Sequence, residues 1–183
     1  PDSQVSFFVR QVPGGVFSTH VHKQVAVGER VTVTGPLGSF WLRPADAPLL
    51  LVAGGSGLAP VLALLEGARE RSVARPVTLL FGARSQRDLY ALDAIRALAA
   101  DWPAAFDFIP VLSDEPTGSD WSGARGFVTE VMAERMPPEC HAYLCGPPPM
   151  IDAATALLLE RGVAREHIHA DRFTTQHDLQ ATA

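Results

Sequence analysis

The sequence predicts an α/β protein with a five-stranded, parallel, doubly wound sheet. From about residue 48 onward, short apolar or β-branched runs alternate with helix-length segments, the pattern of repeated βαβ units. The first run, residues 49–53, is apolar without alternation, which suits a strand buried on both faces of a parallel sheet. A glycine-rich turn follows at once, and Pro60 has the φ angle of a first helical turn. Strand, turn and helix are therefore expected in direct succession.

The elements follow from the same patterns along the chain. Asp88 is placed to cap the second helix of the repeat and Gly162 to end the last one. Residues 112–126 are predicted to form a long surface loop. If the strand order is 3-2-1-4-5, the loops after the first and fourth strands line one crevice. Strands are predicted at 49–53, 76–82, 105–111, 140–145 and 167–171, and helices at 60–71, 88–99, 127–135 and 148–161.

The first forty-odd residues have a different character. Residues 5–10 and 29–34 both have strand composition, and Gly14, Gly15 and Ser18 mark one or two helical turns between them. Two strands do not form a stable sheet alone, so we predict the C-terminal part of an antiparallel β domain. Since the chain starts without Met in strand-like sequence, we expect a fragment of a longer protein. The predicted domains are 1–44, incomplete, and 45–183.

Composition narrows the possible partners and compartments. The net charge is −5 with no Lys/Arg cluster, which argues against a nucleic-acid or anionic-membrane surface. No apolar run is long enough to span a bilayer, and no secretory signal is visible. Cys140 and Cys145 would face opposite sides of one strand, so a mutual disulfide is not expected. These features predict a cytoplasmic protein.

The glycine turn is the clearest candidate binding site. Gly54, Gly55 and Gly57 leave backbone N–H groups unobstructed at a helix N-terminus, where the helix dipole also favours a phosphate. The alternative, a tight turn without a ligand, is weaker with three glycines and a proline. No Lys-Ser/Thr pair follows, so the turn is not a P-loop. The Gly-x-Gly-x-x-Gly fingerprint is absent, and no acidic residue ends the second strand, which disfavours an ordinary dehydrogenase.

Several motifs together carry a family resemblance. Residues 54–60 and 143–150 resemble the paired nicotinamide-binding motifs of the ferredoxin–NADP reductase superfamily. The match is best with the FAD/NADH reductase components of bacterial oxygenases that act on aromatics, alkenes or methane. Residues 35–40 resemble the segment that joins the flavin barrel to the nicotinamide domain. Residues 13–18 resemble the loop that binds the FAD pyrophosphate, and residues 169–173 resemble the C-terminal signature of the family. The resemblance covers nearly the whole chain in order.

The resemblance implies two cofactor sites. The FAD diphosphate would contact Gly15, Val16, Phe17 and Ser18, mostly through backbone N–H groups. Phe17 has core packing as an alternative role. The nicotinamide dinucleotide would contact Gly54, Gly55, Ser56, Gly57, Leu58, Ala59 and Pro60 from the first motif, and Gly146, Pro147 and Met150 from the second. Ser56 stands where the family usually has Thr and keeps the hydroxyl.

The resemblance also implies roles near the reacting atoms. Cys145 would lie near the nicotinamide carbon that releases hydride and orient the ring, because hydride transfer needs no protein nucleophile. Asp171 stands where many relatives have Glu near the flavin, and its shorter side chain argues against a proton-handling role. These two are the candidate catalytic residues. Phe173 would either flank the isoalloxazine or pack in the core.

One departure from the family concerns the flavin. The family's Arg-x-Tyr-Ser/Thr motif does not occur here and would fall before Pro1, as would a [2Fe–2S] ferredoxin domain. Neither cysteine has the spacing of an iron–sulfur ligand, so that centre would belong to a missing N-terminal region. The pairs His20/His22 and His167/His169 lack a convergent carboxylate or thiolate, so no metal site is predicted in this chain.

The sequence also favours one form of the nicotinamide cofactor. NADP-specific relatives have a Ser-Arg pair after the third strand, whereas this chain has Ser113-Asp114 followed by Glu115. Two carboxylates would repel a 2′-phosphate, so NADH is expected, although Arg84 and Arg87 act in the opposite direction.

The predicted function is hydride transfer from NADH to FAD, with electrons passing through a [2Fe–2S] centre to an oxygenase or ferredoxin component. The alternatives are a flavin reductase or flavohaemoglobin-type module, and a non-catalytic nucleotide-binding electron-transfer subunit.

Overall fold

The structure is a computed structural model that describes residues 5–35 and 37–174. It divides into two compact units, 1–39 and 40–183, which are treated separately below. Pro36, part of the predicted junction at 35–40, lies outside the described residues.

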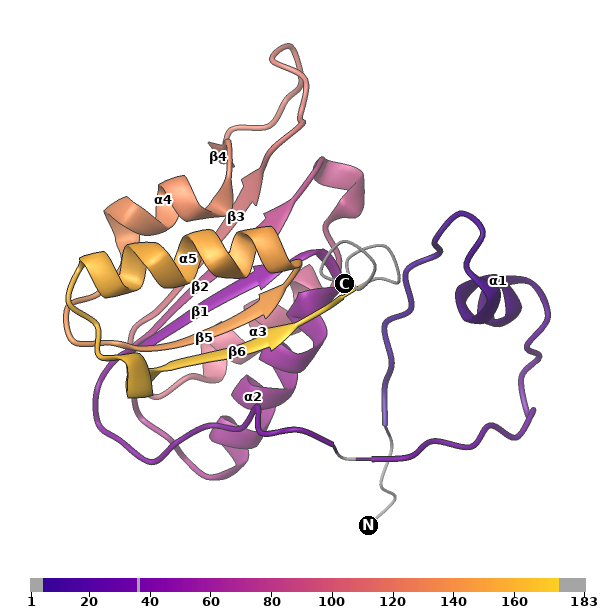
Figure 1. Ribbon diagram of the computed structural model, residues 1–183, viewed down its shortest axis with the longest axis horizontal. Helices are drawn as coiled ribbons and strands as arrows, with labels where there is room; N and C mark the ends of the chain where they lie inside the picture. Colours follow the sequence, from indigo (N-terminus) through magenta and orange to yellow (C-terminus); the bar gives the residue numbers. More distant parts are fainter. Residues whose placement is uncertain (1–4, 36, 175–183) are drawn as a thin grey trace, which may run out of the picture. The chain divides into compact units, whose positions relative to one another are not determined.

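The second unit is built on one parallel sheet. Its strands lie in the order β4-β3-β2-β1-β5-β6, and every adjacent pair is parallel (Figure 1). The predicted five-stranded sheet and its order are confirmed, because the five predicted strands occupy the positions β3-β2-β1-β5-β6. The strands are β1 Leu49–Gly54, β2 Val77–Ala83, β3 Phe106–Leu112, β4 Ala124–Arg125, β5 His141–Gly146 and β6 Ile168–Arg172.

Strand β4 is an addition to the prediction. It lies within the stretch expected to be loop and pairs with β3 at Val111↔Ala124 and Leu112↔Arg125. Two residues are too few to produce a period-2 pattern, so the sequence holds no signal for this strand.

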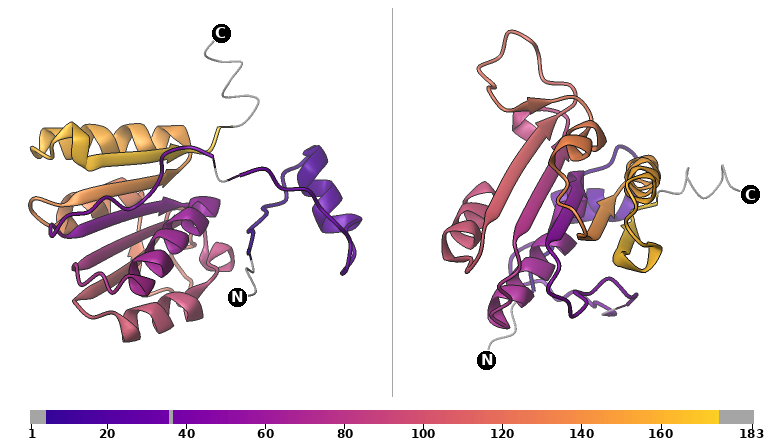
Figure 2. Two further views of the ribbon diagram at one scale, coloured as in Figure 1. Left: turned by 90° about the horizontal axis from the view of Figure 1, so that it is seen from below. Right: turned by 90° about the vertical axis from the view of Figure 1, so that its left-hand side faces the viewer.

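Helices cover both faces of the sheet (Figures 1 and 2). Helices α2 (Leu58–Glu70) and α3 (Leu92–Asp101) pack on one face, whereas α4 (Val128–Arg135) and α5 (Pro148–Glu160) pack on the other. All six residues of β1 are buried because the strand is central and covered on both sides. The uninterrupted apolar run is therefore explained by burial on both faces.

The start of α3 corrects one prediction. Asp88 does not cap this helix, which begins at Leu92. Instead, Asp88 closes a capping box with Ser85 around the 3₁₀ turn η2 (Gln86–Asp88). Ala91 then takes a left-handed conformation, with φ of 56°, before the helix starts. At the end of α5, Gly162 has φ of 82° and its N–H binds the Leu159 carbonyl, as predicted.

The first unit contains α1 (Val16–Lys23), in agreement with the predicted one or two turns. Residues 5–10 and 29–34 do not form strands, contrary to the prediction. Their composition favours a pleated sheet, but a strand also requires a neighbour for its backbone N–H and C=O groups. Neither segment has a ladder partner among the described residues. The expected β domain is thus not seen in this unit, and that assignment stays a prediction.

A linker of residues 40–48 belongs to the second unit and is fixed to it. Leu42 is buried in the core beside α2, and the Arg43 backbone N–H donates to Tyr143 Oη over 2.8 Å. The Arg75 guanidinium donates to the carbonyls of Arg43 and Ala47. Phe40 also packs edge-on against the Tyr143 ring. Side-chain and backbone contacts therefore hold the linker along its length.

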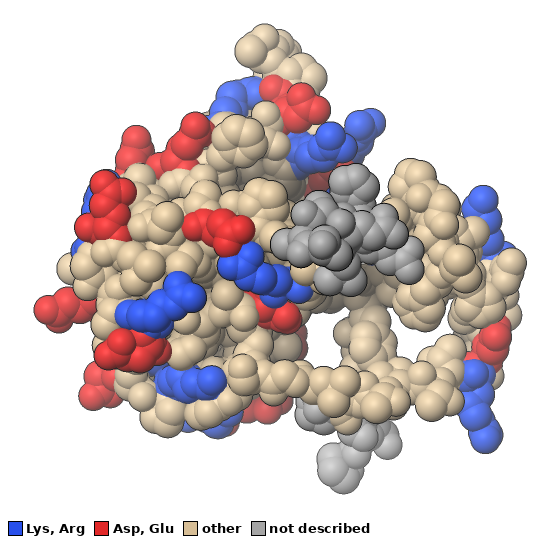
Figure 3. All heavy atoms as spheres, in the orientation of Figure 1, with Lys and Arg blue, Asp and Glu red and all other residues tan. Residues whose placement is uncertain are grey.

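The two cysteines lie on opposite faces of the sheet, as predicted. Cys140 packs in the core with α4 and α5, and Cys145 packs in the core with α2 and α3. Within the described residues, no helix is long and apolar enough to cross a membrane. In the same part of the chain no group of three His, Cys, Asp or Glu side chains could hold a metal ion. Basic and acidic side chains are interspersed over the second unit on the face shown in Figure 3.

Candidate nucleotide-binding crevice

The carboxyl ends of β1 and β5 meet at one place in the sheet. The strands pair in register to Ala53↔Cys145, so the glycine loops that follow both strands start side by side. After β1 the chain forms a 3₁₀ turn, η1 (Gly55–Gly57), and enters α2 directly. After β5 the chain passes Pro147 and enters α5. Two helix N-termini therefore open at the same edge of the sheet.

Glycine is needed here because the two loops touch through their backbones. A Cβ atom on Gly54 would lie 2.6 Å from Met150 Sδ and 3.0 Å from Pro147 Cδ. Gly146 has φ of 154°, and its Cβ would lie 3.1 Å from the Gly54 Cα. A Cβ on Gly57 would overlap the carbonyl group of Cys145. The two predicted motifs, residues 54–60 and 143–150, are therefore packed directly against each other.

The edge of this structure has the character of an anion site. The N-cap positions of α2 and α5 are Gly57 and Pro147, which supply no capping side chain. The first turns of both helices contain no acidic residue. Gly55, Ser56, Ala59 and Pro60 are half-buried and remain within reach of a ligand. The first turn of α5 begins with two prolines, and the N–H groups of Met150 and Ile151 donate to the Pro147 carbonyl. The N–H donors for an anion would therefore come from the turn before α2, while the dipoles of both helices favour a phosphate at this edge.

Cys145 lies at this edge but is fully buried. Burial, and next the neighbouring Asp171 carboxylate, raise the pKa of the thiol to about 12. Asp171 is the register partner of Cys145 in β6 and is half-buried. The sulfur is therefore a neutral thiol at physiological pH, which is unsuited to nucleophilic attack or metal binding and compatible with a packing or orienting role.

Phe173 follows β6 and is brought to the same loop. Its N–H donates to the Gly146 carbonyl over 2.9 Å, and its side chain is 37% exposed. The preceding Arg172 forms an ion pair with Asp152 of α5 at 2.6 Å, which raises the pKa of the guanidinium and lowers that of the carboxyl. The structure thus gives Phe173 an exposed position near the crevice rather than a core position.

Asp114 and Glu115 lie beyond β3 on the same edge of the sheet. Asp114 is exposed, and its N–H donates to the Arg84 carbonyl over 2.8 Å. Glu115 is held by the backbone N–H and the side-chain amide of Gln86, each at 2.9 Å. These hydrogen bonds, the side-chain one first, lower the pKa of the Glu115 carboxyl. Two carboxylates therefore lie beyond the carboxyl end of β3, with Arg84 and Arg125 beside them.

The candidate FAD residues of the first unit form a closed loop. Ser18 is buried, and its Oγ accepts from the Val12 N–H over 3.1 Å. Gly15 is the N-cap of α1, whereas Val16 and Phe17 are exposed in its first turn, Phe17 by 68%. The Ser18 hydroxyl is thus used within the loop, and the first-turn N–H groups are the part suited to an anion.

Tyr90 is a residue of this edge that the sequence reasoning missed. Its hydroxyl donates to the Gly55 carbonyl over 3.0 Å, and its ring lies edge-on to Phe81. A single tyrosine before a helix belongs to no motif, so the sequence alone offered no signal for it.

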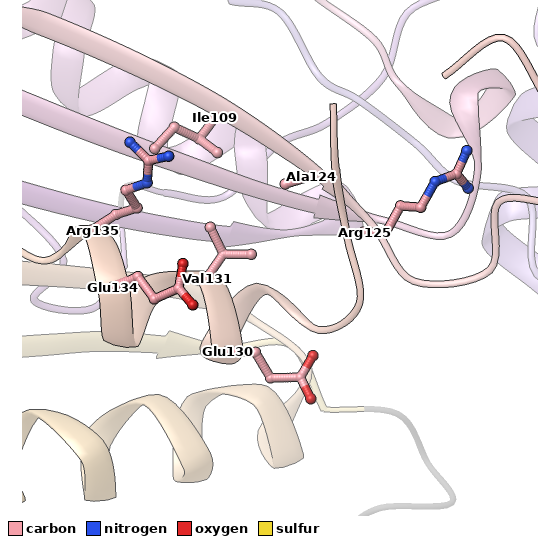
Figure 4. Close-up of a pocket in the computed structure, with 7 residues that line it drawn as sticks. All are labelled: Ile109, Ala124, Arg125, Glu130, Val131, Glu134 and Arg135. Atoms are coloured by element: carbon pink, nitrogen blue, oxygen red, sulfur yellow. The ribbon is translucent and has the colours of Figure 1, made fainter. Parts of the chain in front are cut away.

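A separate hollow of about 310 Å³ lies on the other side of the sheet, between α4 and the β3–β4 edge (Figure 4). Its apolar wall is formed by Ile109, Ala124 and Val131. Arg125 points away from that wall and binds carbonyls of the 115–121 loop, and Glu130 binds the Phe127 N–H. Two of the four charged side chains of the hollow, Arg125 and Glu130, therefore bind the backbone of the fold, and Glu134 and Arg135 complete its lining.

The chain is similar to known electron transfer components and reductases. The chain is 49% identical over 174 residues to the xylene/toluene monooxygenase electron transfer component of Pseudomonas putida, with 94% of this chain and 50% of that protein covered. The crystal structure of the Amycolatopsis cytochrome P450 reductase superposes with a TM-score of 0.83 at 38% identity, over 91% of this chain and 51% of that one. A ferredoxin reductase in carbazole 1,9a-dioxygenase gives a TM-score of 0.80 at 33% identity, over 91% and 50%.

The chain therefore spans about half the length of the curated relatives it matches. Residues 51–156 match the family described as the oxidoreductase NAD-binding domain, and this range includes the turn after β1 and the loop after β5. Because the match extends over more than half of the sequence, the chain belongs to the oxidoreductase NAD-binding domain family, and it resembles the reductase components of oxygenase systems.

Proposed function

We propose that this chain is the nicotinamide-binding part of a flavoprotein reductase that takes hydride from NADH and delivers electrons to an oxygenase. The observation that carries the proposal is the packing of two glycine loops at adjacent strand ends, which brings two uncapped helix N-termini together. The similarity of the chain to electron transfer components and reductases supports the proposal that an oxygenase is the electron acceptor.

The residues of the crevice fit a dinucleotide. The turn at 54–57 and the first turn of α2 would bind the diphosphate through backbone N–H groups, with Ser56 adding a hydroxyl. Gly146, Pro147 and Met150 would shape the side of the site toward the nicotinamide, with Cys145 packed beneath it. The bound cofactor itself supplies the hydride, so the protein has only to bind and orient it.

The flavin would be held by other parts of the same protein. The first turn of α1, at Gly15, Val16, Phe17 and Ser18, would bind the FAD diphosphate, and Phe173 would flank the ring. Exposed apolar side chains of the first unit, among them Val5, Phe7 and Val31, support its assignment to a larger flavin domain that would cover them. A [2Fe–2S] centre would belong to a further part of the protein, since Cys140 and Cys145 are buried on opposite faces.

NADH is proposed as the electron donor over NADPH. Asp114 is exposed at the carboxyl end of β3, and Glu115 is held in place beside it by Gln86. Both carboxylates would repel a 2′-phosphate at this end of the crevice.

Steady-state kinetics of the full-length reductase with NADH and NADPH test the proposal. We expect NADH-dependent reduction of bound flavin and a kcat/KM at least tenfold higher for NADH. An equal or higher kcat/KM for NADPH would contradict the proposal that the Asp114 carboxylate disfavours NADPH. A full-length protein that binds NADH without reducing flavin would instead be the non-catalytic electron-transfer subunit. Reduction of free flavin, without electron delivery to an oxygenase, would favour the flavin reductase.

A further inference from the structure

Tyr90 joins the loop before α3 to the glycine turn after β1. Its Oη donates a hydrogen bond to the Gly55 carbonyl, with an oxygen–oxygen distance of 3.0 Å. The same oxygen is hydrogen-bonded by the backbone of Ala59, in the first turn of α2. One phenol therefore contacts both the carbonyl of the turn and an amide of the helix that follows it.

Several contacts fix the Tyr90 side chain in this position. The ring lies against Phe81 of β2 with centroids 5.5 Å apart and planes at 87°, an edge-to-face arrangement. The left-handed conformation of the next residue, Ala91, turns the chain from this loop into α3. A non-glycine residue in that conformation is strained, and such strain gathers at sites where geometry matters. Burial raises the pKa of Tyr90 to about 12, so the hydroxyl keeps its proton at physiological pH.

The hydrogen bond from Tyr90 matters because glycine has little intrinsic preference for one backbone conformation. Gly55 has φ of 53°, in the left-handed region, and glycine accepts positive and negative φ with similar ease. The Gly55 carbonyl also accepts from the Leu58 N–H, and without the Tyr90 bond that contact alone would keep the peptide plane from rotating and directing the oxygen toward the crevice. A carbonyl oxygen there would repel a phosphate, whereas the N–H groups attract it.

We propose that Tyr90 is a positioning residue for the dinucleotide, which holds the Gly55 carbonyl inward so that N–H groups of the turn face the diphosphate. This inference rests on the proposed function. Tyr90 acts through the backbone of the turn and takes no part in hydride transfer. Its effect should therefore depend on whether the ligand carries a diphosphate.

The test compares Tyr90→Phe with Tyr143→Phe in the full-length reductase. These are the two tyrosines of the chain, and Tyr143 uses its hydroxyl to accept from the Arg43 N–H in the linker. The Ki values of ADP-ribose, which carries the diphosphate, and of adenosine, which does not, are measured against NADH. Thermal unfolding of both variants is recorded alongside.

For Tyr90→Phe we expect the Ki of ADP-ribose and the KM of NADH to rise about tenfold, with kcat and the Ki of adenosine changed less than about twofold. Tyr143→Phe should leave the Ki of ADP-ribose unchanged. Equal weakening of both inhibitors would mean a general structural role and would overturn the inference. Unchanged or tighter ADP-ribose binding would also overturn it, the latter because the phenol would then compete with the phosphate for the Ala59 amide. If the wild-type protein neither oxidises NADH nor binds ADP-ribose, the proposed function itself fails.

Discussion

The backbone of Gly57 lies so close to the Cys145 carbonyl that position 57 has no room for a Cβ atom. The Gly57 φ of −63° would suit any residue, so space rather than backbone conformation requires glycine here. This contact joins the turn after β1 to the end of β5.

Gly57→Ala should therefore destabilise the protein by at least about 2 kcal/mol, because the obstacle is backbone that cannot move aside easily. Gly67→Ala is the matched control, since a Cβ at position 67 of α2 would meet only the end of the Arg71 side chain at 3.9 Å. That change should stabilise the helix by about 0.5–1 kcal/mol. Urea unfolding measures both. Equal effects of the two substitutions would contradict the packing described here.

Arg75→Met should loosen the linker. Arg75 is only 5% exposed and donates to the carbonyls of Arg43 and Ala47, which would lose a charged donor. We expect a loss of about 2 kcal/mol in the free energy of unfolding. Arg96→Met is the control, because the Arg96–Asp93 ion pair is exposed and should contribute less than about 0.5 kcal/mol. If the Arg75 variant is as stable as the Arg96 variant, these bonds do not hold the linker.

Acid should destabilise the protein through a histidine cluster at the amino end of β5. His141 is buried, stacks on His167 at 4.1 Å and lies near His169, Tyr143 and Arg75. Burial first, then the charges of His167, Arg75 and His169, lower the pKa of His141 to about 4. Since this pKa lies below the ordinary value of about 6.5, the stabilisation is complete above pH 6.5 and is lost as the pH falls toward 4.

We expect the free energy of unfolding to fall by on the order of 1–3 kcal/mol between pH 7 and pH 4.5. His141→Phe retains a ring to stack on His167 and should show a shallower dependence. The pKa of His169 is also lowered by burial and by Arg43, so part of the pH dependence of the free energy of unfolding should remain in this variant. Urea titrations across this pH range make the comparison. A variant with the wild-type slope would show that His141 does not carry the effect.

Asp114→Ala should improve the use of NADPH. Removal of an exposed carboxylate from the end of β3 weakens the repulsion of a 2′-phosphate, so the kcat/KM for NADPH should rise roughly five- to tenfold. NADH, which lacks that phosphate, should be affected less than about twofold. Asp101→Ala removes the same charge at the far end of α3 and serves as the control. An equal change for both cofactors would place Asp114 outside the ribose end of the site.

Both thiols should resist alkylation in the native protein. Burial raises the pKa of Cys140 to about 11 and, with Asp171, that of Cys145 to about 12. With iodoacetamide at pH 8, we expect modification at least roughly 100-fold slower than for a free thiol, and rapid modification of both cysteines in urea. Peptide mapping distinguishes the two positions. Fast native labelling of Cys145 would mean that the crevice opens to its sulfur.

The sheet could be predicted because its central strands β1 and β5 are buried throughout and leave largely apolar runs. Gly54, Gly57 and Gly146 also indicated where the loops after β1 and β5 meet, since close packing of the two loops requires that residue. Local patterns failed where a competing contact, near or distant in sequence, decides the structure. Asp88 has the composition of a helix cap, yet it pairs with Ser85 and leaves α3 to begin after Ala91. Tyr90 acquires its place only when β2 and the turn after β1 are side by side.

The attachment of the linker has a practical consequence for chimeric proteins. The groups that secure residues 40–48, including Leu42, Arg75 and Tyr143, all lie on the α/β side of the boundary after Ser39. A fusion made before Phe40 should therefore carry over the α/β unit together with the linker and the side chains that hold it. A junction at residue 45 would leave Leu42 and Arg43 with the wrong fusion partner and expose the surface that they cover.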